Sequence, residues 1–116
     1  MAKRRAETSE CAKARMAMQD TLDVVGGKWK LVIISILRNG TLRFKELARE
    51  AEITPRILSK ELKELELNGL VKRTVRDTRP VTVEYSLTPY SKTLGDMVVA
   101  MPNWGVQHRK HLVKAG

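Results

Sequence analysis

A set of polar and basic residues lies in the middle of the chain at the spacing of one helix face. Four of its members are three and four positions apart: Arg56, Ser59, Lys60 and Lys63. Thr54 can cap this helix by accepting a backbone N–H, and Pro55 loses nothing at the first helical position because that N–H has no helical partner. Guanidinium, ammonium and hydroxyl groups are the donors that contact phosphates and base edges. The face is therefore predicted to bind a polyanion.

The charge of the chain agrees with such a partner. Its 116 residues contain 22 Lys and Arg but 13 Asp and Glu, which gives a formal net charge of +9 and an isoelectric point near 10.1. A membrane-surface protein would share this balance, but no helix pairs a bulky apolar face with an all-cationic one, and no apolar run has membrane-spanning length. No apolar segment follows the basic N-terminus, as a signal peptide would require. We expect a cytoplasmic protein.

The elements that must position the basic face are short and amphipathic. Apolar residues at offsets of three and four predict helices over 18–25, 28–38, 44–51 and 55–68. Two runs that alternate apolar and polar residues, 71–76 and 81–87, flank Asp77–Pro80 and predict a β-hairpin. Thr88 and Pro89 repeat the Thr-Pro helix start. A last helix is expected after this start, with an apolar stripe from Leu94 to Trp104. Pro102 lies within that stripe, so this helix should bend or restart there.

This order predicts a mainly α protein with a small β-hairpin wing (α+β), a winged helix-turn-helix with extra N- and C-terminal dimerisation helices. Residues 1–15 are charged and Ala-rich without an apolar period, and we expect a basic, flexible arm. We expect residues 16–116 to form the winged helix DNA-binding domain with its terminal dimerisation helices. The single cysteine, Cys11, excludes an intrachain disulfide and fits a reducing compartment.

Four separated motifs carry a family resemblance. They are Leu22–Trp29, Arg43–Leu47, Leu62–Glu66 followed by Gly69–Val71, and Val83–Pro89. In this order they resemble the HxlR family, small bacterial and archaeal transcription regulators that are related in fold to the MarR group. The resemblance implies a homodimeric winged-helix repressor or activator that binds double-stranded DNA.

The winged-helix interpretation assigns roles to the basic residues. Thr54, Pro55 and Arg56 begin the recognition helix, and Arg56 can contact guanine through its guanidinium fork. Ser59, Lys60 and Lys63 are expected to bind phosphates. In the wing, the candidate contacts are Arg76, Thr78 and Arg79, and further phosphate contacts are Lys28, Arg43 and Lys45. The alternative is that these charges only solvate an exposed helix face and a hairpin tip.

Leftover apolar surface predicts a homodimer, because the first and last helices need another surface to cover them. The residues expected at this contact are Leu22, Leu94, Met97, Val98, Met101 and Trp104. The alternative is that these helices fold back on their own domain. Cys11 is a possible redox sensor or an exposed bystander, since it lies upstream of the position where related regulators carry a sensing cysteine. A small-molecule effector is equally possible, and its chemistry is open.

Other function classes have less support. We expect no enzyme, because the chain has no paired-carboxylate motif, nucleophile elbow or glycine-rich phosphate loop. His108 and His111 could share a helix face, but they lack further ligands nearby, so we expect no metal and no cofactor. A non-specific nucleic-acid-binding module, either nucleoid-coating or RNA-binding, is the main alternative. A winged domain for protein interaction would have no use for a basic helix face.

Overall fold

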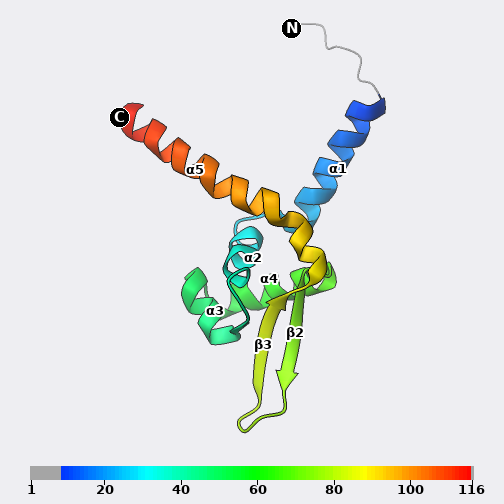
Figure 1. Ribbon diagram of the computed structural model, residues 1–116, viewed down its shortest axis with the longest axis vertical. Helices are drawn as coiled ribbons and strands as arrows, with labels where there is room; N and C mark the ends of the chain where they lie inside the picture. Colours follow the sequence, from blue (N-terminus) through cyan, green and yellow to red (C-terminus); the bar gives the residue numbers. More distant parts are fainter. Residues whose placement is uncertain (1–8, 116) are drawn as a thin grey trace, which may run out of the picture.

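The computed structural model describes residues 9–115. Its elements, in chain order, are α1 (Ser9–Val25), α2 (Lys30–Leu37), β1 (Leu42–Arg43), α3 (Phe44–Ala51), α4 (Pro55–Leu67), β2 (Val71–Arg76), β3 (Thr82–Leu87), a 3-10 helix η1 (Pro89–Leu94) and α5 (Gly95–Ala115). The β2–β3 hairpin projects from one end of the molecule, whereas α1 and α5 project from the other end as two diverging arms (Figure 1). The fold is the predicted winged helix-turn-helix.

Local signals set the ends of the two helices of the helix-turn-helix. The hydroxyl of Thr54 accepts a hydrogen bond from the backbone N–H of Ile57 at 3.3 Å, and Pro55 is the first residue of α4, as predicted. Gly69 follows the helix with φ of +73°, a backbone conformation that residues other than glycine rarely adopt. At the start of α3, the carboxylate of Glu46 accepts the N–H of Arg43 at 2.9 Å.

The hairpin belongs to a three-stranded antiparallel sheet with the strand order β1-β3-β2. Val71 pairs with Leu87 at its base, and Arg76 pairs with Thr82 near its tip. The stub strand β1 adds Arg43 opposite Glu84 on the other side of β3. The sheet therefore joins the segment before α3 to the root of the wing.

The hydrophobic core is centred on α2, which packs against α3, α4, β3 and α5. Ile33 and Ile34 of α2 are fully buried. Tyr85 is also buried, and its ring centre lies 6.3 Å from that of Phe44. These aromatic side chains therefore act in packing, as their spacing indicates.

One expectation about the first helix is corrected. The first helix begins at Ser9 and not near Met18, so that the part of the expected flexible arm from residue 9 onward is helical. Residues 1–8 lie outside the described part of the chain. Strong helix formers such as Ala, Lys and Met explain the extension, because propensity supports a helix where an apolar period is missing. Near the C-terminus, α5 is one helix with Pro102 inside it, so of the bend and the restart expected at this proline, the restart does not occur.

The described helices include none that is long and apolar enough to cross a membrane.

Candidate nucleic-acid interface

The outer face of α4 carries the predicted basic residues. Arg56, Lys60 and Lys63 are exposed and Ser59 is half-buried. On the opposite face, the side chains of Leu58, Leu62 and Leu65 are buried in the core. The first turn of α4 contains no acidic residue, and both Thr54 and Pro55 are exposed. The positive end of the helix is therefore open to an anion.

A salt-bridge cluster fixes α4 to α2, and the sequence analysis did not predict it. The ammonium of Lys30 donates a hydrogen bond of 2.7 Å to Oε2 of Glu61 and also forms an ion pair with Glu64. Lys30 shares the inward face of α2 with Ile33 and Leu37, which is the signal that could have identified it as buried.

The cluster shifts the pKa values of its members. Burial alone would lower the pKa of Lys30, but hydrogen bonds and the charges of Glu61 and Glu64 outweigh it and raise that pKa above its usual value of 10.5. The hydrogen bond from Lys30, aided by its charge, lowers the pKa of Glu64 below 4.5. Near neutral pH both groups are charged. Lys30 thus compensates two carboxylates of α4 from the side of α2.

The wing presents its two arginines differently. Nε of Arg76 donates a hydrogen bond of 2.9 Å to Oε1 of Glu84, so its charge is largely compensated within the hairpin. Arg79 is exposed at the tip, and no acidic side chain among residues 9–115 pairs with it. The Thr78 hydroxyl donates to the carbonyl of Pro80 at 2.8 Å. Thr78 thus orders the tip from which Arg79 extends.

The remaining predicted contacts lie on other elements. Arg43 and Lys45 are exposed at the start of α3, and strand pairing places Arg43 beside the root of the wing. The ammonium of Lys28 lies 4.9 Å from the ring centre of Trp29, where it forms a cation–π contact. Cys11 is exposed on α1, the helix that extends away from the hairpin (Figure 1).

Residues 9–115 contain no group of three His, Cys, Asp or Glu side chains that could hold a metal ion. His108 stacks on Trp104, with ring centres 4.9 Å apart and planes inclined by 11°.

The predicted dimer residues fall into two groups. Val98 is buried in the core of its own domain, and Leu94 and Met97 pack against that core while partly exposed. Val98 therefore folds back on its own domain, whereas Leu94 and Met97 keep part of their surface exposed. Leu22, Met101 and Trp104 instead keep 51–66% of their surface exposed along the two arms.

Comparisons with known proteins agree with this architecture. Residues 24–112 match the HxlR-like helix-turn-helix family. The chain is 46% identical over 93 residues to BH0655 of Halalkalibacterium halodurans, an uncharacterized HTH-type transcriptional regulator, covering 78% of this chain and 82% of that one. It is 38% identical over 98 residues to another such regulator, YdeP of Bacillus subtilis, covering 84% of this chain and 77% of that one.

Solved structures show the same likeness. The redox regulator HypR in its reduced form superimposes with a TM-score of 0.78 at 41% identity, covering 84% of this chain and 98% of that one. A structure assigned to the MarR family, from Enterococcus faecalis V583, has a TM-score of 0.72 at 31% identity and covers 98% of this chain and 99% of that one. The chain therefore belongs to the HxlR-like helix-turn-helix family, a winged-helix family of transcriptional regulators and not of enzymes.

Proposed function

We propose that this chain is a homodimeric, site-specific DNA-binding regulator that reads an inverted-repeat operator with α4 and the β2–β3 wing. One observation carries the proposal: the inner face of α4 is fixed by core leucines and by Lys30, while its capped first turn and its basic side chains are exposed. A rigid helix that presents donors outward is the arrangement that enters a major groove.

The residues divide between base reading and positioning. Arg56 lies in the first turn of α4, and its planar fork matches O6 and N7 of guanine, so we assign it to base contact. Ser59, Lys60 and Lys63 lie farther along the same helix and hold its register through phosphates. Arg79 extends the contact from the wing toward the minor groove or the adjacent backbone, with Thr78 ordering the tip and Arg76 at the end of β2 beside the tip. Arg43, Lys45 and Lys28 add phosphate contacts.

The homodimer is supported by the shape of the chain. Its Cα radius of gyration is 18.1 Å, whereas a compact domain of this length has about 13 Å. The excess comes from α1 and α5, which extend beyond the core (Figure 1) and carry exposed apolar side chains such as Leu22, Met101 and Trp104. A second copy would cover these arms and set two α4 helices about 34 Å apart, one turn of DNA.

A direct test is selection of bound fragments from a genomic DNA library at physiological salt, followed by footprinting of the strongest fragment. We expect an inverted repeat with half-sites about one helical turn apart. Arg56→Ala should weaken binding to this site and relax the preference for one base pair, by about 1–3 kcal/mol. Lys63→Ala should weaken binding to all sequences. It should also lower, by about one, the steepness with which the logarithm of the binding constant falls with the logarithm of the salt concentration, here called the salt slope. Lys114→Ala, at the end of α5, is the control.

The same experiment separates the alternative function. A non-specific nucleic-acid-binding module would enrich unrelated fragments, and its affinity would fall steeply as salt rises. In that case Arg56→Ala and Lys63→Ala would have the same effect on every fragment. Such a result would remove both the operator and the assignment of Arg56 to base reading.

A further inference from the structure

Leu67, the last residue of α4, is the most exposed of the large apolar side chains in residues 9–115, with 86% of its surface open. It belongs to neither of the two arms, α1 and α5, that we assign to the dimer. A single exposed leucine is common on protein surfaces, so exposure alone assigns no role. The role follows from the neighbours of Leu67 on the helix.

The side chain of Leu67 shares the basic outer face of α4. At about 3.6 residues per turn, Leu67 falls within about 20° of Arg56 and Lys60 around the helix axis. Lys63 lies about 40° away from it. All four side chains are exposed, and the leucines of α4 that are buried in the core lie on the opposite side. The surface that we assign to DNA therefore contains one large apolar group among its cations.

A shallow hollow beside Leu67 shows which part of DNA this group can meet. The hollow is lined by Lys63, Glu66 and Leu67. Lys63 is exposed and attracts a phosphate, whereas Glu66, which is half-buried, repels one. A phosphate is therefore disfavoured next to Leu67, and the edge of a base is favoured.

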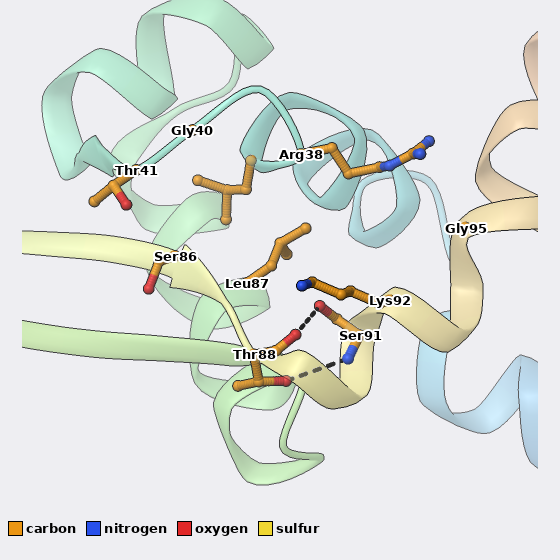
Figure 2. A pocket seen from close by; sticks show the side chains of 10 residues that line it. Arg38, Gly40, Thr41, Ser86, Leu87, Thr88, Ser91, Lys92 and Gly95 are labelled. Atoms are coloured by element: carbon orange, nitrogen blue, oxygen red, sulfur yellow. Dashed lines mark hydrogen bonds between the residues drawn. The ribbon is translucent and has the colours of Figure 1, made fainter.

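Hydrogen bonds hold the segment that follows Leu67. The Thr88 hydroxyl donates to the carbonyl of Gly69 at 2.6 Å, and the Thr88 backbone N–H donates to the carbonyl of Leu70 at 3.1 Å. Thr88 is itself held by Ser91, whose N–H it accepts at its hydroxyl and whose hydroxyl donates to its carbonyl (Figure 2). The end of α4 is thus fixed before any partner arrives, which lowers the ordering cost of a contact.

We propose that Leu67 is a specificity-determining residue that contacts the 5-methyl group of a thymine in the major groove, an inference that rests on the proposed function. Of the four bases, only thymine presents a methyl group on its major-groove edge. At a rise of about 1.5 Å per residue, Leu67 lies about 16 Å along α4 from Arg56, which corresponds to about five base pairs. The thymine therefore lies in the same half-site as the base read by Arg56.

The test replaces each thymine of the operator, as recovered by the genomic selection, with uracil, which removes only the methyl group. Fluorescence anisotropy measures the affinity of wild type and Leu67→Ala for each duplex. We expect one uracil, about five base pairs from the position that Arg56→Ala relaxes, to weaken wild-type binding by about four-fold, because the burial of one methyl group is lost. Leu67→Ala should bind this duplex as tightly as it binds the thymine duplex.

Leu67→Met is the matched control, because methionine keeps a similar apolar volume at the same position. It should retain the sensitivity to uracil, and thermal melts report whether both variants are folded. If uracil has the same effect on wild type and Leu67→Ala at every position, while Arg56→Ala still relaxes one base pair, this proposal is overturned and the proposed function stands. A selection that yields no preferred fragment would overturn both.

Discussion

Lys30 of α2 and Glu61 of α4 form an ion pair with an Nζ–Oε2 distance of 2.7 Å, and their side chains are only 10% and 14% exposed. Lys30→Met would leave Glu61 in a largely buried position without its partner. We expect the free energy of unfolding to fall by about 1–3 kcal/mol. Urea denaturation followed by circular dichroism measures this change.

Lys28→Met is the matched control for that measurement, because Lys28 is an exposed lysine two residues earlier that forms no ion pair within residues 9–115. Its effect should stay within about 0.5 kcal/mol. Equal losses in the two variants would mean that the cluster with Glu61 and Glu64 does not hold α4.

The same cluster predicts how stability depends on pH. The pKa of Glu64 is lowered below 4.5 in the folded state, so its contribution is present above that pH and is lost as pH falls through the folded pKa. The pKa of Lys30 is raised above 10.5, so its contribution is present below that pH and is lost as pH rises through the folded pKa. Between these limits the cluster adds no pH dependence.

Urea midpoints measured from about pH 3 to pH 7 test the acid side of this prediction. We expect Glu64→Gln to lose less stability than the wild type on acidification, because glutamine does not titrate. Lys30→Met should show the same flattening, since the pKa of Glu64 then returns toward its usual value. If both variants lose as much stability on acidification as the wild type does, the ion pair of Lys30 with Glu64 is not the cause of the acid dependence.

The parts of the fold that the sequence predicts well are those set by neighbouring residues. Thr54 and Pro55 define the start of α4 through a cap and a missing donor, and the structure confirms both. The period-two runs around the Asp77–Pro80 turn predict the hairpin, whose strands are β2 and β3. In each case the physical cause lies within a few residues, so that no knowledge of the tertiary structure is needed.

The features that were missed depend on packing between distant segments. Lys30 reads as a surface lysine until α4 brings Glu61 to it from 31 positions away. Val98 reads as part of an uncovered stripe until η1 turns α5 onto the core, where it becomes buried. The pairing of Arg76 with Glu84 likewise requires the register of the hairpin. These contacts decide which charged and apolar groups remain available for partners.

The ion pair between Arg76 and Glu84 leads to a prediction for the wing. Arg79→Ala should weaken DNA binding and lower the salt slope by about one, because Arg79 has no acidic partner in the described chain. Arg76→Ala should have a smaller effect, since Glu84 already compensates the charge of Arg76. Glu84→Gln should strengthen binding by releasing Arg76. Fluorescence anisotropy at several salt concentrations measures all three, and equal effects of the two alanine variants would show that the ion pair does not persist beside DNA.

The exposed arm residues predict the outcome of a charge placed in the proposed dimer contact. Trp104 is 66% exposed on α5, so Trp104→Glu should not disturb the core of its own domain. It should, however, place a carboxylate in an apolar interface at a cost of several kcal/mol, which would convert dimer to monomer. Analytical ultracentrifugation measures the mass, and a thermal melt reports whether the fold is intact.

Leu67→Glu is the matched control for the dimer test, because Leu67 is 86% exposed at the end of α4 and belongs to neither arm. It should leave the mass at that of a dimer. If wild type and Trp104→Glu have the same mass, the arms do not dimerise through α5. If both carry the dimer mass while Leu67→Glu is monomeric, the contact lies instead at the end of α4, and the two reading helices would face each other and could not reach successive major grooves.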